Sequence, residues 1–248
     1  MRIQNLLIIV LSLATLSCAT VVKVATGTSG YYQVEGNLVT YSSWNPMSLQ
    51  YSVFAMPEAD AESFEQLSQK YGRDKSRVYK GRLLIEGADS GSFSLLNDYY
   101  AMDKKHGYVQ GKVLPHSDAK SLVILGGNWA RDKNDYYYGA AKLNVCDIES
   151  FRIIRPERGL DSLCYFFMGR PVAVESIDSL QLLPASYAKD SSKVYWGDRV
   201  IEEADSASFL VKDDSSISIA RDSKQCYSAD RVLVCTDLNE SGREFCGC

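Results

Sequence analysis

The chain repeats one pattern of polar and apolar positions at a fixed interval. An aspartate recurs at four steps of 29 residues and a last step of 32, at Asp74, Asp103, Asp132, Asp161, Asp190 and Asp222. The fifth residue after each of these acids is aromatic, giving the column Tyr79, Tyr108, Tyr137, Phe166, Tyr195 and Tyr227. A period of this size is typical of repeat architectures, in which one unit cannot bury its apolar face alone.

Three further columns keep the same period. A second acidic column reads Asp60, Asp89, Asp118, Asp147, Ser176 and Asp205. A serine follows three residues later in every unit, at Ser63, Ser92, Ser121, Ser150, Ser179 and Ser208. An apolar column follows the first aromatic column, at Ile85, Leu114, Leu143, Val172 and Ile201. Agreement across so many columns excludes a chance recurrence of aspartate.

The local signals within a unit favour strands. Val78-Tyr79 and the run 194–196 are β-branched and aromatic. A glycine soon after the aromatic marks a turn in five of the units, at Gly81, Gly111, Gly139, Gly169 and Gly197. We therefore predict an all-β protein of tandem hairpin or meander repeats, with two to four short antiparallel strands each, forming an extended or curved array. The segment 65–71 also permits a helical turn. A small β-propeller is the alternative fold, although 29 residues is short against the roughly 40 of a common four-stranded blade.

One run of the repeat resembles a known family. The segment 132–138 reads Asp-Lys-Asn-Asp-Tyr-Tyr-Tyr, and the wider unit reads Tyr-Ala-x-Asp-Lys, Val-Tyr, Gly and Ala-Asp-x-x-Ser-Phe. This pattern resembles the bacterial DKNYY family over about residues 58–234. The resemblance implies no catalytic or ligand-binding residues, because the function of that family is uncharacterised. The unit at Asp161 is the most divergent, since it lacks the Tyr-Ala lead-in.

The N-terminal segment predicts export. Arg2 precedes an apolar run from Leu6 to Leu16, which is too short for a membrane span and typical of a signal peptide over residues 1–17. The sequence Ala-Thr-Leu-Ser-Cys at 14–18 is similar to a bacterial lipobox, so we expect cleavage before Cys18 and acylation of that residue, which anchors the chain to a membrane. An ordinary signal peptide with an accidental cysteine is the alternative. Ala19 favours sorting to the outer membrane, facing the periplasm.

The remaining boundaries follow from the repeat. Residues 18–30 are an anchored linker, and residues 31–57 are an irregular capping unit, in which 44–56 resembles an insertion. The repeat domain spans 58–234, and residues 235–248 form a cysteine-rich C-terminal cap. Terminal repeats commonly depart from the pattern because they cover an exposed edge.

Composition fits an exported globular chain. The hydrophobic fraction is 46%, the charged fraction 23% and the net charge −4. Because the chain has no run of Lys and Arg, we expect no nucleic-acid partner.

Six cysteines remain beyond Cys18, and an even number in an exported chain favours disulfides. Cys146 lies at the end of one unit and Cys164 at the start of the next, so a bond between them would join the divergent unit to its neighbour. Cys226 and Cys235 lie on either side of a predicted hairpin turn near Asp230. They pair either with Cys246 and Cys248, in an order that spacing leaves open, or with each other. A zinc site is the alternative, although paired Cys-x-x-Cys motifs are lacking.

Four sets of side chains are candidates for chemistry. The first acidic column either caps its turns or binds a ladder of calcium ions. His106 and His116 are placed symmetrically about Gly111, so a hairpin centred there would bring both imidazoles to a metal. The recurring serines lack a recognisable base and are expected to be structural. The aromatic column forms either the core between units or an exposed face for sugars or peptides.

These observations predict a non-catalytic lipoprotein of the bacterial envelope, without a cofactor, that acts as a scaffold or protein-interaction module with a possible envelope protein partner. A glycan-binding or small-ligand-binding protein with an exposed tyrosine face is one alternative. A metal-dependent hydrolase using the two histidines is the other.

Overall fold

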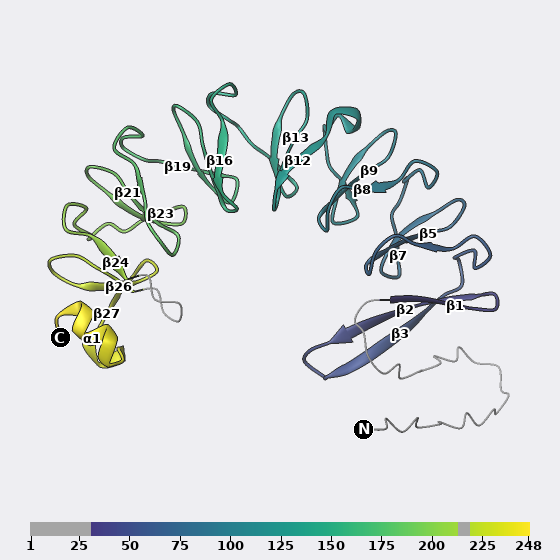
Figure 1. Cartoon of the computed structure of the whole chain (residues 1–248), viewed down its shortest axis with the longest axis horizontal. Helices are drawn as coiled ribbons and strands as arrows, with labels where there is room; N and C mark the ends of the chain where they lie inside the picture. The colour runs from purple at the N-terminus through teal and green to yellow at the C-terminus, as the bar shows by residue number, and fades with distance from the viewer. Residues whose placement is uncertain (1–30, 213–218) are drawn as a thin grey trace, which may run out of the picture. The chain divides into compact units, whose positions relative to one another are not determined.

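A computed structural model describes residues 31–212 and 219–248, which form small antiparallel β-sheets in tandem (Figure 1). The predicted signal peptide 1–17, the acylation site Cys18 and the linker 18–30 lie outside the described residues. The chain divides into two compact units, Met1–Phe93 and Ser94–Cys248.

The first unit contains a three-stranded and a four-stranded sheet, each with its strands in chain order. The three-stranded sheet contains β1 (Tyr31–Glu35), β2 (Leu38–Asn45) and β3 (Gln50–Met56). The four-stranded sheet contains β4 (Glu65–Gln66), β5 (Tyr71–Arg73), β6 (Val78–Lys80) and β7 (Leu83–Leu84).

The second unit contains five four-stranded sheets, again with neighbouring strands hydrogen-bonded in chain order. The first two contain β8 (Ser94–Leu95), β9 (Tyr100–Met102), β10 (Gly107–Val109) and β11 (Lys112–Val113), then β12 (Val123–Gly126), β13 (Trp129–Arg131), β14 (Tyr136–Tyr138) and β15 (Ala141–Lys142). The third contains β16 (Arg152–Arg155), β17 (Arg158–Leu160), β18 (Tyr165–Phe167) and β19 (Arg170–Val172). The last two contain β20 (Gln181–Leu182), β21 (Tyr187–Lys189), β22 (Val194–Trp196) and β23 (Arg199–Val200), then β24 (Leu210–Lys212), β25 (Ile219–Arg221), β26 (Cys226–Ser228) and β27 (Arg231–Leu233).

The predicted all-β array of hairpin repeats is confirmed, with four strands in each regular unit. A unit of 29 residues accommodates four strands because most of them are only two or three residues long. A unit of 29 residues therefore reaches the number of strands in a propeller blade by using shorter strands, so unit length alone does not argue against a propeller.

Tight two-residue turns join the third and fourth strands. Between β18 and β19 the turn residues Met168 and Gly169 both have positive φ, at 48° and 76°, as a type I′ hairpin turn requires. A Cβ atom on Gly169 would lie 2.5 Å from the Cβ of Tyr138, so this glycine also allows a close approach of the preceding sheet.

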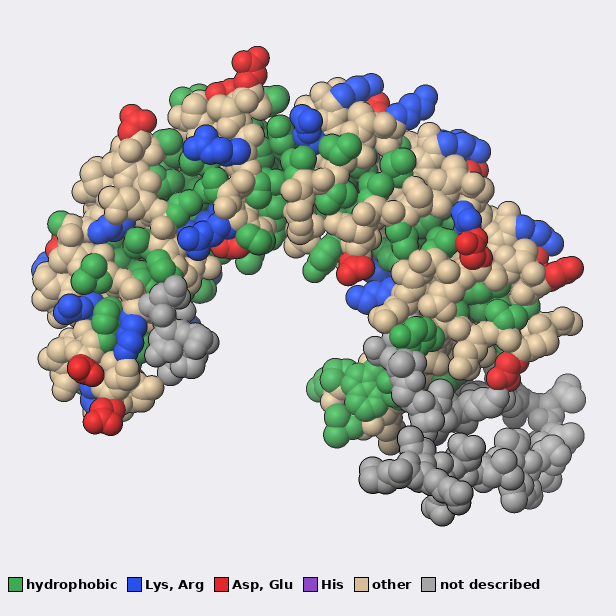
Figure 2. Space-filling model, in the orientation of Figure 1, with side chains coloured by type: hydrophobic (Ala, Val, Ile, Leu, Met, Phe, Trp, Pro, Cys, Tyr) green, Lys and Arg blue, Asp and Glu red, His purple; other side chains and the backbone are tan. Residues whose placement is uncertain are grey.

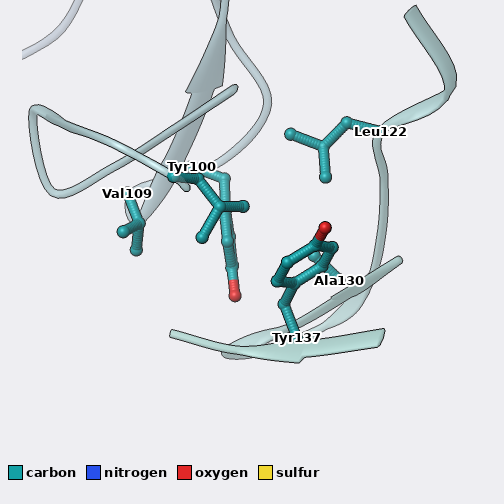
Figure 3. Close-up of a cluster of buried hydrophobic side chains, with 6 residues drawn as sticks. Tyr100, Val109, Leu122, Ala130 and Tyr137 are labelled. Atoms are coloured by element: carbon teal, nitrogen blue, oxygen red, sulfur yellow. The ribbon is translucent and has the colours of Figure 1, made fainter. Parts of the chain in front are cut away.

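The core lies between successive sheets rather than within one. Tyr100 and Val109 from one sheet of the second unit pack with Leu122, Ala130 and Tyr137 of the next, and all are buried (Figure 3). Because this cluster draws side chains from two adjacent repeats, neither repeat closes that core alone.

The structure corrects one local expectation and gives the strands of a second segment. The segment 65–71, for which a helical turn was considered, begins with the strand β4. Residues 44–56, interpreted as an insertion, complete β2 and form β3.

The C-terminal cap contains α1 (Glu240–Cys246), where Asn239 accepts a hydrogen bond from the Gly242 N–H and Gly247 ends the helix with a φ of 78°. Short 3₁₀ turns lie at Ala119–Ser121 and Cys235–Asp237. Within 31–212 and 219–248, no helix has the length and apolarity to cross a membrane.

Candidate functional site

The recurring aspartate is the most elaborate polar site of each unit. In the unit that carries the 132–138 run, the Asp132 carboxylate is buried in the turn between β13 and β14. Its Oδ1 accepts hydrogen bonds from the backbone N–H groups of Asn134 and Asp135, both at 2.8 Å. Its Oδ2 accepts from the Tyr137 hydroxyl at 2.9 Å and from the Asp118 backbone N–H at 2.7 Å.

These four donors fill the acceptor capacity of the carboxylate. An ionised aspartate has two oxygens with about four lone-pair sites. Each site of Asp132 faces an N–H or O–H group, so none is directed toward a cation. The geometry therefore favours the turn-capping interpretation over the calcium ladder that the sequence also allowed.

The same contacts recur along the array. The column aromatic donates its hydroxyl to the acid five residues before it at distances of 2.6–2.9 Å, in the pairs Tyr79 with Asp74, Tyr108 with Asp103, Tyr195 with Asp190, and Tyr227 with Asp222. In the divergent unit Phe166 has no hydroxyl to give. There the backbone N–H groups of Cys146 and Asp147 both donate to Asp161 Oδ2, at 2.9 and 3.1 Å, and the acceptor remains satisfied.

The second acidic column accepts hydrogen bonds from the serine column. Ser121 donates its hydroxyl to Asp118 Oδ1 at 3.1 Å and accepts from the Lys133 N–H at 3.0 Å. Lys133 also forms an ion pair with Asp118 at 2.7 Å. Equivalent serine hydroxyls accept from the residue after the anchoring acid in the units at Ser63, Ser150, Ser179 and Ser208. These serines connect two turns of the same unit, which agrees with the structural role expected for them.

The pattern of residues that builds this network is also what the family comparison detects. A family model described as the DKNYY family matches residues 48–158 and 80–231, which together cover most of the chain. The chain belongs to the DKNYY family. No curated protein and no solved structure matches it. In this chain the matched region includes the buried Asp132 with its Tyr137, and the exposed Lys133 beside them.

Burial and hydrogen bonding act in opposite directions on the anchoring acids of the DKNYY units. Burial is the largest single effect and raises the pKa of Asp74, Asp132, Asp190 and Asp222, but the donated hydrogen bonds together outweigh it. The pKa of each of these carboxyls is therefore held below its ordinary value. Burial, followed by the neighbouring carboxylate, raises the pKa of Tyr79 and of Tyr227 to about 12.

Stability should consequently fall in acid. A carboxyl whose pKa is lowered by folding contributes fully above its unfolded value of about 3.9, and the contribution is lost as the pH falls through the folded value. We expect urea midpoints to be level near neutral pH and to decrease steadily below about pH 5. A phenol raised by folding behaves in the opposite sense, so stability should also fall above about pH 10. Equal midpoints at pH 5 and pH 3 would contradict the role given to these acids.

The column aromatics are buried, which corrects one alternative. Tyr79 is 3% exposed, and Tyr108, Tyr137, Phe166, Tyr195 and Tyr227 are fully buried. The exposed platform of column tyrosines, considered for sugars or peptides, is therefore not formed. These rings pack between sheets and direct their hydroxyls to the acids.

A further column, three residues before the anchoring acid, was missed from the sequence. In the second unit its side chains reach the backbone of the following sheet. The Tyr100 hydroxyl donates to the carbonyls of Asn128 and Gly139, at 2.6 and 3.0 Å, and Trp129 Nε1 donates to the Pro156 carbonyl at 2.7 Å. Tyr187 donates to the Ala229 carbonyl at 3.0 Å. The Tyr-Ala lead-in contained this signal, because its Tyr occupies the column.

Arg158 occupies that column in the divergent unit and is fully buried. Its Nη1 donates to the Leu183 carbonyl at 3.2 Å, and its Nε lies 3.3 Å from Glu157 Oε1. Burial lowers the pKa of this guanidinium. A buried cation with few hydrogen bonds is costly compared with a residue of similar size that lacks the charge.

Replacement of Arg158 by the column's usual residue should therefore stabilise the protein. We expect Arg158→Tyr to raise the free energy of unfolding by about 1–2 kcal/mol, because the ring removes a desolvated charge and keeps a donor directed at the next sheet. Chemical denaturation of both proteins measures the difference. A lower midpoint in the variant would show that Arg158 has partners more favourable than the contacts described above.

The two histidines are not placed opposite each other. Val109 pairs with Lys112, so the turn is centred between Gln110 and Gly111 rather than on Gly111. This register is offset by one residue from the one that would align His106 with His116. His116 also adopts a φ of 64° in the following turn. The expected pair of facing imidazoles is therefore wrong.

The structure pairs the six described cysteines as Cys146–Cys164, Cys226–Cys246 and Cys235–Cys248. The last two follow the first of the two arrangements considered from the sequence, and the predicted hairpin turn lies between β26 and β27. Within 31–212 and 219–248, a side-chain cluster with metal-binding geometry forms at Cys146, Asp161 and Cys164. Its two sulfurs are bonded to each other, so they cannot serve as zinc thiolates.

Removal of the Cys146–Cys164 disulfide should be costly. The bond closes a loop with a sequence separation of 18, for which chain entropy predicts a stabilisation of about 3 kcal/mol. We expect a Cys146→Ser, Cys164→Ser double variant to lose about this much in denaturant unfolding. A non-reducing peptide map checks the pairing itself, and a peptide that joins Cys146 to any other cysteine would overturn it.

Proposed function

We propose that this DKNYY protein is a non-catalytic envelope lipoprotein, anchored through Cys18, whose repeat array serves as a scaffold for a protein partner. The observation that carries the proposal is the occupation of the recurring polar side chains. The Asp, Ser and Tyr columns are engaged with one another and with the backbone, and they hold turns and sheets together. Residues engaged in this way stabilise an array rather than act on a substrate.

The N-terminal sequence and the disulfides support the proposed envelope location. The chain carries a segment with the layout of a signal peptide, a cysteine in a lipobox-like context, and three disulfide pairs. Disulfides persist in oxidising compartments such as the bacterial periplasm.

The divergent unit supplies a candidate contact surface for a partner. Leu163 is 66% exposed in the turn after Asp161, at a position where the other units carry Ser, Lys or Asn. Ile148 is 58% exposed and follows Asp147. The Ser162 hydroxyl donates to Asp147 Oδ2 at 2.6 Å, which holds the two segments together. Leu163 therefore replaces a polar turn residue, and exposed Ile148 adds a second apolar side chain beside it, which suits contact with a protein.

Cross-linking in the native envelope tests the proposal. The anchored protein is compared with a Cys18→Ser variant and with an Ile148→Ser, Leu163→Ser variant, which places polar residues at both positions. The matched control is Leu210→Ser, at a side chain that is 53% exposed on another sheet. We expect one protein partner, lost in both test variants and kept in the control. Recovery of glycan or metal without a protein partner would contradict the scaffold role.

A further inference from the structure

The β2–β3 hairpin ends in an exposed apolar tip. Met47 is 95% exposed and Leu49 71%, and Trp44 beside them is 39% exposed. Figure 2 shows hydrophobic side chains gathered at this tip. From Ser43 to Ser52 no residue is buried, so this part of the hairpin extends beyond the core of its sheet. The strands have eight and seven residues, against two to four in the repeats.

The whole surrounding segment lacks charge. Residues 36–57 contain no Asp, Glu, Lys, Arg or His, although charged residues make up 23% of the chain. A surface for a soluble protein partner normally has a polar rim with charged groups. An uncharged tip is instead suited to the acyl region of a lipid bilayer.

The side chains are graded as a membrane interface requires. Met47 and Leu49 lie at the turn, and one step back Trp44 pairs with Tyr51 across the strands, with ring centroids 4.8 Å apart. Further back, the Arg82 guanidinium lies over the Phe54 ring, 4.3 Å from its centroid. This order places aliphatic groups deepest, aromatic rings at the interface and a cation at the level of the headgroups.

The turn also satisfies two of its own backbone N–H groups. The N–H groups of Met47 and Ser48 both donate to Asn45 Oδ1, at 2.9 and 3.4 Å. A turn that enters lipid must satisfy its polar groups internally, because no water is present to accept from them. An exposed turn in water has no such requirement.

We infer that the tip of the β2–β3 hairpin inserts into the outer part of a phospholipid bilayer. The inference rests on the proposed anchoring at Cys18, which brings the hairpin to the membrane. Cys18 and the start of β1 at Tyr31 are separated by thirteen residue steps, which span at most about 45 Å. The anchor therefore restricts the first sheet to the neighbourhood of the lipid surface, where Trp44, Met47 and Leu49 need only reach the interface.

Fluorescence quenching tests the insertion. Full-length acylated protein is reconstituted into vesicles of phosphatidylethanolamine and phosphatidylglycerol, with or without a lipid brominated on its acyl chains. Subtraction of the spectrum of a Trp44→Phe variant isolates Trp44 from the other two tryptophans. We expect bromine to quench the Trp44 signal, and a Met47→Asp, Leu49→Asp variant to lose that quenching. The matched control is Leu83→Asp, at a side chain that is 67% exposed in the same unit and should leave the quenching intact.

Anchoring at Cys18 and insertion of the hairpin tip are measured separately. Flotation of the vesicles reports anchoring, which Cys18→Ser should abolish. Protein that floats with the vesicles while Trp44 remains unquenched would overturn the insertion and leave the anchoring intact. Unquenched Trp44 together with cross-links between hairpin tips would assign the surface to a second copy of the chain, and this too would overturn the inference.

Discussion

Replacement of Asp132 by Ala is expected to lower the free energy of unfolding by about 4 kcal/mol. The substitution leaves three backbone N–H groups and the Tyr137 hydroxyl without their acceptor. Each stranded buried donor costs about 1–3 kcal/mol, and local relaxation recovers part of the sum. Chemical denaturation followed by far-ultraviolet circular dichroism measures the loss.

Asp118→Ala is the matched control, because it removes the same side chain from the second acidic column of the same unit. The Asp118 side chain is 25% exposed, and its ion pair with Lys133 lies at the surface. Water replaces much of what is lost there, so we expect a cost of about 1 kcal/mol. Equal losses in the two variants would show that the four-donor geometry of Asp132 has no special importance.

Replacement of Trp129 by Ala should be about as damaging, with an expected loss of about 4 kcal/mol. The indole is fully buried and packs against Tyr138 of its own sheet and against Phe151, which directly precedes the next sheet, with centroid distances of 4.7 and 5.9 Å. It also donates to the Pro156 carbonyl. The variant thus loses a large apolar contact and a hydrogen bond between two sheets. Denaturant unfolding measures this loss.

The same substitution at Trp44 serves as the control, since that indole is 39% exposed and contacts Tyr51 within its own hairpin. We expect Trp44→Ala to cost less than about 1 kcal/mol. A Trp129→Ala protein as stable as the wild type would contradict the inference that this column joins successive sheets.

The architecture could be predicted from the sequence because each repeat places the same residue types at the same positions. The second acidic column, the serine column and the anchoring acid each recur, and the interpretation of Asp132 as a turn cap needed only the hydrogen-bonding capacity of a carboxylate near a tight turn. Because a serine recurs at the same position in every unit, the sequence indicated a structural role for these serines rather than catalysis by one of them.

The misses have physical reasons. The position of His106 relative to His116 depends on a turn whose centre lies half a residue from Gly111, and a period-two strand reverses its faces with such a shift. Helix α1 has only seven residues, so periodicity gave it no signal, and it is held by its caps and by the Cys226–Cys246 disulfide. The exposure of Met47 depends on how far the β2–β3 hairpin extends beyond the buried part of its sheet, which no local pattern reports.

Stability measured with excess calcium and with EDTA tests the central claim most directly, namely that the recurring acids hold turns rather than ions. Asp132→Ala alone cannot decide this, because loss of a calcium ligand would also destabilise the chain. We predict that the wild-type unfolding midpoint is the same in calcium and in EDTA, and that the difference between wild type and Asp132→Ala is the same in both. A wild-type midpoint that rises with calcium, and falls in EDTA to that of the variant, would contradict the account.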